Sequence, residues 1–323
     1  MKMWRPDRQL VGPRPLVERD IPRLNRVFSE AFTDRYRRDG LVGVRVPALN
    51  PDVWRYALRD AKEGAMAWVD DDAIVGFNIA HHSGTEGWMG PLAVRPDRQG
   101  LGLGASMVRS AIEWLESEGV RTIGLETMPR TVDNIGFYSR LGFVPGHLTI
   151  TVSGDVVGRA PRDRAVRLSR LPAGERDELL ATCRDRLQRS APGYDFTREH
   201  VLTEELHIGD TSVLEEHGTV RGFALWHAAP LAETRGSDEI RVLKLFADSV
   251  ESFERLVASV EAAAAKLRIR RVAVRCQTQH PASYQFLIQR GYRVRWTDLR
   301  MTLEGYPEVV LPEGEVLYSN WEI

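Results

Sequence analysis

An internal repeat limits the possible folds of this chain more than any other feature. The segment RTIGLETM (121–128) resembles RRVAVRCQ (270–277), which lies 149 residues further along the chain. Both segments begin with Arg and then alternate apolar with other residues, as half-buried β-strands do. The same offset places Gly142-Phe143 on Gly291-Tyr292, and the alignment needs no gap from about residue 90 to 143. The 323-residue chain is therefore expected to contain two copies of one domain, which its length also suggests.

The repeat predicts a first domain over residues 1–155 and a second domain over residues 160–323. The segment SGDVVGRAPRDR (153–164) is expected to join them, because it is rich in Gly, Arg and Asp and has no periodicity. The chain ends in LPEGEVLYSNWEI, which is expected to pack back on a domain through its large apolar residues. These are Leu317, Tyr318 and Trp321.

The composition argues against several classes of protein. Acidic and basic residues nearly balance, with a formal charge of -1, so no overall field favours nucleic acid or an anionic membrane. The two cysteines, Cys183 and Cys276, show no metal-ligand spacing, so free thiols and no metal site are expected. The N-terminal residues lack a signal-peptide core, and no apolar run is long enough to cross a membrane. A cytoplasmic protein is the expectation.

Both halves have the same order of elements, in which hairpin strands precede strand–helix units. In the first half, a short strand near 14–17 precedes a helix that Asp20 is expected to cap. Two alternating segments joined at DDDA predict a hairpin, and a glycine loop follows the next strand. This order predicts an α+β fold, in which each domain has a mixed, mostly antiparallel sheet flanked by helices. The remaining predicted elements are a helix over 104–118, a strand over 122–128, a helix over about 132–141 and a strand over about 145–152.

A dense glycine loop, RQGLGLGASM (98–107), precedes the first of these helices. Its amides and the positive end of the helix dipole favour an anion, and glycine allows a ligand to approach the backbone closely. One hypothesis is a dinucleotide site, since Gly100-x-Gly102-x-x-Ala105 fits G-x-G-x-x-G/A and Glu126 could bind a ribose. The five residues between the strand and the loop, and the antiparallel segments upstream, argue against this hypothesis.

The longer stretch GPLAVRPDRQGLGLGASM supports a second hypothesis. Gln99-x-x-Gly102-x-Gly104 resembles the acyl-CoA motif Q/R-x-x-G-x-G/A of the GNAT superfamily of N-acyltransferases, and the later YSRLGF follows in the family's order. The resemblance implies two tandem GNAT-like domains, with acetyl-CoA as the co-substrate and no metal. It also implies that the loop binds the pyrophosphate and that the preceding strand pairs with the pantetheine. These contacts fall on Leu92, Ala93, Val94, Gln99, Gly100, Leu101, Gly102, Leu103, Gly104 and Ala105.

The resemblance further implies a general acid. In the family, a Tyr four residues before the Gly of an LGF ending lies near the CoA sulfur and can protonate the departing thiolate. Tyr138 matches this position, and a phenol is protonated at neutral pH. Many members have an Asn seven residues before this Tyr. This chain has Thr131 there and Asn134 about one turn later, and both are assigned to the acyl-CoA site.

The general base is assigned from strand geometry. Glu86 and Trp88 share one face of their strand by the period-2 rule, and a carboxylate there can accept the proton of an amine, directly or through water. Glu86 is therefore the predicted base, with Glu126, His81 and His82 as alternatives. Direct transfer to the amine is expected, because neither cysteine lies in a motif that would activate it as a nucleophile.

The second half keeps the apolar pattern of the fold but has lost the motif. At the 149-residue offset, two carboxylates and a bulky ring stand where a pyrophosphate would bind, and the acid is missing. One acyl-CoA site per chain is therefore expected, with a structural or substrate-side role for the second half. The replacements are Asp248 for Gln99, Glu251 for Gly102, Phe253 for Gly104 and Leu287 for Tyr138.

Together these patterns predict an acyl-CoA-dependent N-acyltransferase that acts on a primary amine of a small molecule or a peptide. Residues 34–56 mix Arg, Tyr and Trp and lie where GNAT members build the acceptor wall. No nucleic-acid or membrane partner is expected, and the protein is expected to be a monomer or a homodimer. The alternatives are a CoA-binding or sensing module without catalysis and, more distantly, a dinucleotide-dependent oxidoreductase.

Overall fold

The computed structural model describes residues 10–156, 165–233 and 236–321. Residues 10–156 are called the first half and residues 165–321 the second half. The first half contains β1 (Leu10–Pro15), α1 (Ile21–Arg38), α2 (Pro51–Ala61), β2 (Ala65–Asp70), β3 (Ala73–Ser83), β4 (Glu86–Val94), α3 (Leu103–Ser117), β5 (Thr122–Thr127), α4 (Val132–Ser139) and β6 (Phe143–Asp155). The second half contains β7 (Val166–Arg167), α5 (Ala173–Ser190), α6 (Thr197–Glu205), β8 (Gly209–Glu216), β9 (Thr219–His227), β10 (Glu239–Ala247), α7 (Val250–Lys266), β11 (Arg271–Gln277), α8 (Pro281–Gln289), β12 (Arg293–Leu303) and β13 (Val316–Ser319).

The predicted order of elements in the first half is confirmed, and so is the α+β fold class. Helix α2 was not among the predicted elements. It begins after Asn50, whose side chain accepts a hydrogen bond from the Asp52 amide. Asp20 stands at the N-cap position of α1, but its carboxylate binds Arg14 and the Val17 amide instead of capping the helix.

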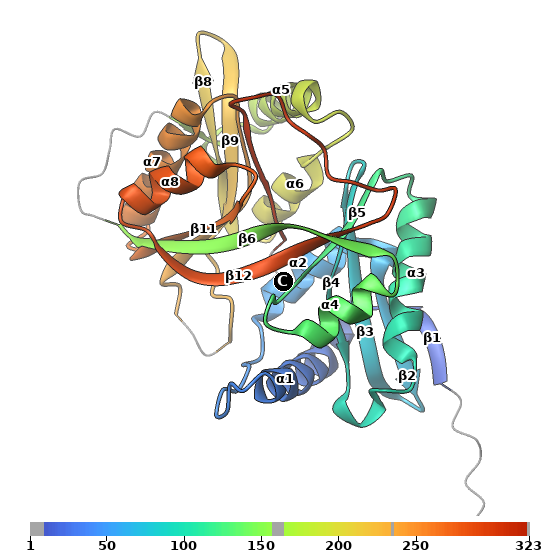
Figure 1. Cartoon of the computed structure of the whole chain (residues 1–323). Coiled ribbons are helices and arrows are strands. Elements are labelled where there is room, and N and C mark those ends of the chain that lie inside the picture. The colour runs from blue at the N-terminus through green and yellow to red at the C-terminus, as the bar shows by residue number, and fades with distance from the viewer. Residues whose placement is uncertain (1–9, 157–164, 234–235, 322–323) are drawn as a thin grey trace, which may run out of the picture.

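The two halves share one continuous sheet, in the order β1-β2-β3-β4-β5-β12-β6-β11-β10-β9-β8-β7. Each half gives its last long strand to the other, since β12 pairs with β5 and β6 pairs with β11. β6 and β12 also pair antiparallel with each other, and they run side by side across the middle of the molecule (Figure 1). Neither half therefore completes its sheet from its own strands.

The strand exchange bears on the predicted linker. Residues 153–155 of that segment belong to β6, and residues 157–164 lie outside the described residues. The division of the chain into residues 1–155 and 160–323 remains a prediction. The sheet adds that the two stretches fold as partners, because a central strand of each one pairs with the other.

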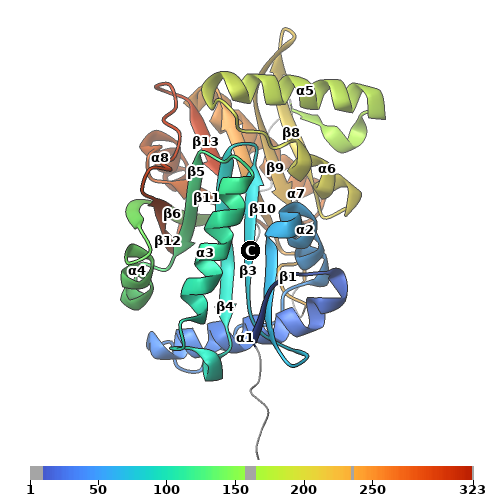
Figure 2. The same ribbon diagram turned by 90° about the vertical axis from the view of Figure 1, so that its right-hand side faces the viewer.

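Helices cover both faces of the sheet in the first half. Alternate residues of a strand point to opposite faces. Phe77 of β3 accordingly packs with Trp54 of α2, whereas the next residue, Asn78, points to the other face and donates a hydrogen bond to the carbonyl of Met107 in α3, at 3.4 Å. Figure 2 shows α3 lying along the near face of β3 and β4. The strand and the helix that flank the predicted acyl-CoA motif, β4 and α3, therefore pack against each other.

The two halves also pack in the same way, because a glycine in a strand of each half lies against the helix that follows. These glycines are Gly76 in β3 and Gly222 in β9. A Cβ on Gly76 would lie 3.0 Å from the Met107 sulfur, and one on Gly222 would lie 2.9 Å from a methyl of Leu256. Met107 and Leu256 stand 149 residues apart, as predicted. The predicted gap-free alignment of the two halves is wrong for the segment just before α3 and α7, however, because the two connections differ in length. Eight residues, 95–102, connect β4 to α3, whereas only Asp248 and Ser249 connect β10 to α7, because the second half has no glycine loop there.

Three further features of the described residues concern membrane helices, metal ligands and cysteines. No helix in them is long and apolar enough to cross a membrane. No group of three or more His, Cys, Asp or Glu in the same residues could hold a metal ion. Cys183 and Cys276 are buried free thiols, and burial raises the pKa of each to about 12, which makes both poor nucleophiles.

Candidate functional site

The site begins where β4 leaves β5. The two strands pair in parallel as far as Met89 and Leu125. Beyond this point β4 stays paired with β3 up to Val94 but no longer pairs with β5. An extra residue in β4 shifts its register against β3, and such a bulge bends a strand. The splay leaves this edge of β4 without a strand partner, so its backbone can pair with an extended ligand.

The glycine loop follows the splayed strand. Gly100 and Gly102 have φ values of 77° and 82°, a left-handed conformation that glycine adopts easily. Gly102 is the N-cap of α3, and its carbonyl accepts the first helical hydrogen bond, from the Ser106 amide at 3.2 Å. The amides of residues 103–105 therefore have no acceptor within the helix, and the helix dipole makes this end positive. This arrangement suits a bound phosphate.

A cleft of about 530 Å³ runs along the splay and the loop, and we call it the β4–β5 cleft. Its walls come from α1, β4, the glycine loop, the end of β5 and α4. Most of the predicted acyl-CoA residues lie in these walls. They are Leu92, Ala93, Val94, Gln99, Gly100, Gly104 and Asn134.

The other predicted acyl-CoA residues lie outside the walls of the cleft. Gly102 and Ala105 stand at the start of α3, Leu101 is 74% exposed at the tip of the loop, and Leu103 is buried beneath it. Thr131 is fully buried, and its hydroxyl donates to Asp39 at 2.6 Å. Of the two candidates near the start of α4, the structure therefore brings Asn134 to the cleft and directs Thr131 away from it.

Tyr138, the predicted acid, lines the same cleft from α4. Its ring packs edge-on against Phe137 and Phe143, with ring centroids 5.0 and 6.1 Å away. Burial raises the pKa of its hydroxyl to about 12. The phenol is therefore protonated at neutral pH and can donate a proton to a group in the cleft.

A second cavity of about 480 Å³ lies between the two halves, and we call it the inter-half cavity. Residues 34–56, the predicted acceptor wall, contribute Tyr36, Val46 and Leu49 to its lining. The cavity adjoins the β4–β5 cleft, so a group that passes through the splay enters it. The residues that line both spaces are Phe32, Tyr36, Met89, Gly90, Pro91, Glu126, Trp296 and Asp298.

The strand exchange brings charges of the second half to the end of β5. Glu126 accepts hydrogen bonds from Arg300, at 2.8 Å, and from Arg275 and Thr149. Burial favours the neutral acid, but the two guanidinium groups outweigh it and lower the pKa of Glu126. No sequence pattern indicates this cluster, because its members are brought together only when β12 pairs with β5.

Glu86, the predicted base, faces neither space. Its side chain is 2% exposed, and it accepts hydrogen bonds from Trp88, at 2.9 Å, and from the hydroxyl of Ser319, at 2.6 Å. Burial raises its pKa, although the charges of Lys244 and Arg300 oppose that shift. Glu86 thus connects β4 to β13 at the contact between the halves, and this geometry does not support the role of base.

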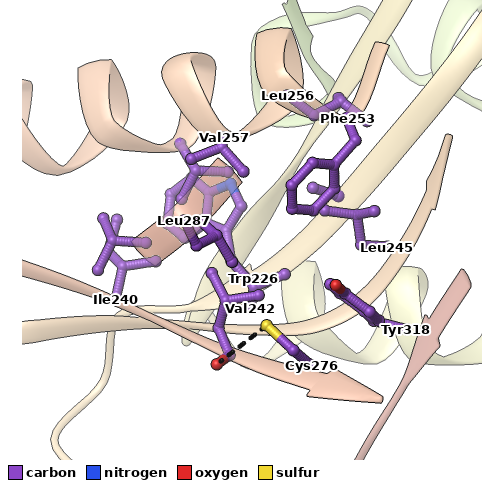
Figure 3. Packing of buried hydrophobic residues seen from close by; sticks show 14 of the residues in the cluster. Trp226, Ile240, Val242, Leu245, Phe253, Leu256, Val257, Cys276, Leu287 and Tyr318 are labelled. Atoms are coloured by element: carbon purple, nitrogen blue, oxygen red, sulfur yellow. Dashed lines mark hydrogen bonds between the residues drawn. The ribbon is translucent and has the colours of Figure 1, made fainter. Parts of the chain in front are cut away.

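The second half has the same splay but fills it with its own chain. β10 pairs in parallel with β11 as far as Val242, and then pairs antiparallel with β13. Tyr318 of β13 is fully buried, with its ring 5.7 Å from Phe253 and its hydroxyl 2.6 Å from that of Ser283. Figure 3 shows Phe253, Leu287 and Tyr318 in one apolar cluster. The expectation that the C-terminal segment packs back on a domain is confirmed.

The comparisons with known proteins agree with this geometry. Residues 24–143 match the model of the Acetyltransferase (GNAT) family, which spans the splay, the glycine loop and Tyr138. Over this stretch the chain is similar to that family. Over 96 residues it is 28% identical to N-alpha-acetyltransferase 30 of Schizosaccharomyces pombe, a match that covers 28% of this chain and 64% of that protein.

Solved structures extend the GNAT fold over both halves. A protein of Pyrococcus horikoshii assigned as an acetyltransferase aligns over 99% of this chain and 96% of its own, with a TM-score of 0.67 at 16% identity. A tandem GNAT protein from the clavulanic acid biosynthesis pathway aligns over 93% of this chain and 99% of its own, with a TM-score of 0.59 at 12% identity. At these identities the likeness concerns the fold, and the chain has the fold of a tandem GNAT protein.

Proposed function

We propose that this protein is an acyl-CoA-dependent N-acyltransferase that transfers an acetyl group from acetyl-CoA to a primary amine. The observation that carries the proposal is the coincidence of two features in the first half. The open edge of β4 faces a cleft, and the same strand leads to a helix start whose amides are free to bind a phosphate. A pantetheine arm and a pyrophosphate, joined as in CoA, fit these two features in that order.

The acyl donor would lie along the β4–β5 cleft. The pyrophosphate would bind the amides of residues 103–105, beside Gln99 and Gly100, and the pantetheine would pair with the backbone of Leu92–Val94. The thioester would then reach the splay, near the residues that line both spaces. The acceptor amine would approach from the inter-half cavity, on the other side of the splay.

The chemistry would be a direct attack of the amine nitrogen on the thioester carbonyl carbon. The C–N bond forms, the C–S bond breaks, and the thiolate takes a proton from Tyr138. A phenol whose pKa is raised to about 12 by burial is still a competent donor, because the transfer occurs as charge develops on the sulfur. The position of Tyr138 in the lining of the cleft supports this role.

The proposal is tested with acetyl-CoA and a panel of primary amines, by measuring thiol release and the mass of the acylated product. Turnover of at least one amine is expected. Gly102→Glu, which carries the charge of Glu251 into the loop, is the control: it should bind acetyl-CoA about 100-fold more weakly and release correspondingly less thiol.

Two results would contradict the proposal in different ways. Binding of acetyl-CoA without turnover of any amine would favour a CoA-binding or sensing module. Binding of a nicotinamide dinucleotide in place of acetyl-CoA would favour the oxidoreductase, although the antiparallel pairing of β1 to β4 differs from the parallel sheet of dinucleotide-binding folds.

A further inference from the structure

The inter-half cavity has the size and lining of a small-molecule site. Its volume of about 480 Å³ falls within the range of ordinary ligand pockets, about 300 to 1,000 Å³. Both halves build it, and large flat side chains make much of its surface. These are Phe28, Phe32, Tyr36, Trp88, Trp296 and Trp321. An apolar, flat molecule fits such walls better than a polar peptide chain does.

The carboxylates in this cavity are occupied by other side chains. Glu126 is held by Arg275, Arg300 and Thr149. Asp298 accepts hydrogen bonds from Trp296, at 3.0 Å, and from Arg275, at 3.2 Å. Glu239 accepts from Ser153 at 2.7 Å and lies 3.5 Å from Arg271. Burial raises the pKa of Asp298 although Arg275 opposes the shift, and both of its oxygens accept hydrogen bonds. Each of the three carboxylates is thus already bound by side chains of the protein, so none of them is well placed to take a proton from an amine.

The lining of the inter-half cavity also contains an imidazole, the side chain of His81. It lies on β3, on the face that carries α1 and α2, and lines the cavity although only 2% of its surface is exposed. Its Nδ1 lies 3.0 Å from the carboxylate of Asp60, and its Nε2 lies 3.3 Å from the carbonyl oxygen of Gly90. Gly90 lines both spaces, so Nε2 contacts a residue at the junction where the thioester and the amine would meet.

Asp60 determines which nitrogen of His81 can act as a base. Asp60 is fully buried, and Arg198 donates to its second oxygen at 2.8 Å. Burial opposes ionisation, but His81 and Arg198 outweigh it and lower the pKa of Asp60 to about 2. The carboxylate is therefore ionised and accepts the Nδ1–H of His81. Nε2 is then the nitrogen that can exchange a proton: when protonated it donates to the Gly90 carbonyl, and without that proton it carries the lone pair of a base.

We propose that the inter-half cavity binds a small primary amine with an aromatic or other flat apolar body, and that His81, oriented by Asp60, is its general base. The proposal rests on the proposed N-acyltransferase activity and names the acceptor class and the base of that same site. Asp60 acts through His81 and is a positioning residue.

The protons balance in this scheme. The amine enters as an ammonium ion and gives one proton to Nε2 of His81, whose new N–H faces the Gly90 carbonyl. The neutral amine forms the C–N bond, the C–S bond breaks, and Tyr138 protonates the thiolate. The nitrogen then loses a second proton, which restores Tyr138 through solvent. The proton on His81 leaves to bulk water, so one proton is released per turnover.

The test uses the full chain with acetyl-CoA and a panel containing an arylalkylamine, an alkyl diamine and a short peptide with a free N-terminus. The arylalkylamine should be the best acceptor by kcat/KM. His81→Asn keeps a donor for Asp60 but lacks the base. With that acceptor its kcat should fall by roughly 10² to 10⁴, while the Kd for acetyl-CoA stays unchanged. Asp60→Asn should lower kcat at an unchanged KM for acetyl-CoA.

His82→Gln is the matched control. His82 is the next residue on β3 but points to the other face, where it contacts Trp114 and the carbonyl of Gly84. Its kcat should match that of the wild type. If His81→Asn does not fold, as the absence of a cooperative unfolding transition by circular dichroism would show, His81→Gln takes its place.

The possible outcomes separate the inference from the proposed function. An active wild type whose His81→Asn variant retains its kcat would overturn the base but keep the acyltransferase. A preference for the peptide would overturn the acceptor class alone. A wild type that binds acetyl-CoA and acylates nothing would overturn the proposed function, and the inference with it.

Discussion

The two halves of the molecule open their sheets at the same place and use the openings differently. In the first half, β4 leaves β5 after Met89, and the space between them is a cleft. In the second half, β10 leaves β11 after Val242, and β13 occupies the space. The helix that follows begins after an eight-residue loop in the first case and almost at once in the second. The same arrangement of strands is thus open in the first half and closed in the second half.

The difference shows that the space beside a splayed strand is available to a ligand only if no other segment of the chain occupies it. β13 satisfies the backbone of β10 and adds buried side chains, each of which contributes about 1.5 to 3 kcal/mol when fully buried. The next residues, Asn320 and Trp321, reach the lining of the inter-half cavity. The closed half therefore stabilises the fold and forms a wall for the open half.

The largest expected effect concerns the open half alone. Tyr138→Phe keeps the ring packing but removes the proton donor, so kcat should fall by roughly 10² to 10⁴ with little change in the Kd for acetyl-CoA. Steady-state kinetics and calorimetry measure the two quantities. Wild-type turnover in this variant, with chemistry limiting the rate, would assign Tyr138 to packing.

The next effect concerns the closed half. Tyr318→Ala removes a fully buried ring from the filled splay and should lower the free energy of unfolding by about 3 to 5 kcal/mol, as large-to-small core substitutions do. Denaturant unfolding measures the loss. Val310→Ala, at a side chain that is 90% exposed, is the control and should change stability by less than about 0.5 kcal/mol. Equal stabilities of the two variants would mean that β13 does not support the fold.

A third prediction makes the open loop resemble the closed half. Gly102→Glu places a negative charge beside the phosphate site and should weaken acetyl-CoA binding by about 100-fold, or about 2.7 kcal/mol. A side chain at Gly102 is strained because its φ is 82°, although a Cβ there meets nothing within 4 Å. Gly102→Asn is therefore the matched control, since Asn tolerates this conformation and carries no charge. If both variants bind equally weakly, strain and not charge is responsible.

The smallest effect is expected from the reverse change. Glu251→Gln removes the matching charge of the second half, but β13 and Phe253 still fill the splay. The number of acetyl-CoA molecules bound and their Kd should therefore be the same as in the wild type. An additional binding event in calorimetry would show that charge alone had closed the second half.

Local patterns predicted much of the first half. The periodicity of residues 104–118 and 122–128 located α3 and β5 to within one residue, and the motif around Gly102 located the start of α3. These features depend on residues close together in the chain. The packing of Leu317, Tyr318 and Trp321 was also predictable, because large apolar side chains near a terminus need a core to cover them.

The exchanged strands and the cluster at Glu126 were not predictable from local patterns. The pairing of β12 with β5 joins residues about 175 positions apart, such as Glu126 and Arg300, and no local pattern encodes a partner at that distance. Strand alternation correctly put Glu86 and Trp88 on one face. It could not show that Ser319 of the distant β13 covers that face and takes Glu86 away from the cleft.

The central claim is that only the open splay binds acetyl-CoA. The most direct measurement is the stoichiometry of acetyl-CoA on the full chain by isothermal titration calorimetry, with Gly102→Glu measured in parallel. We expect one molecule bound per chain and no comparable binding to the variant. Two equivalent sites in the wild type, or full-affinity binding that survives in folded Gly102→Glu, would contradict the account.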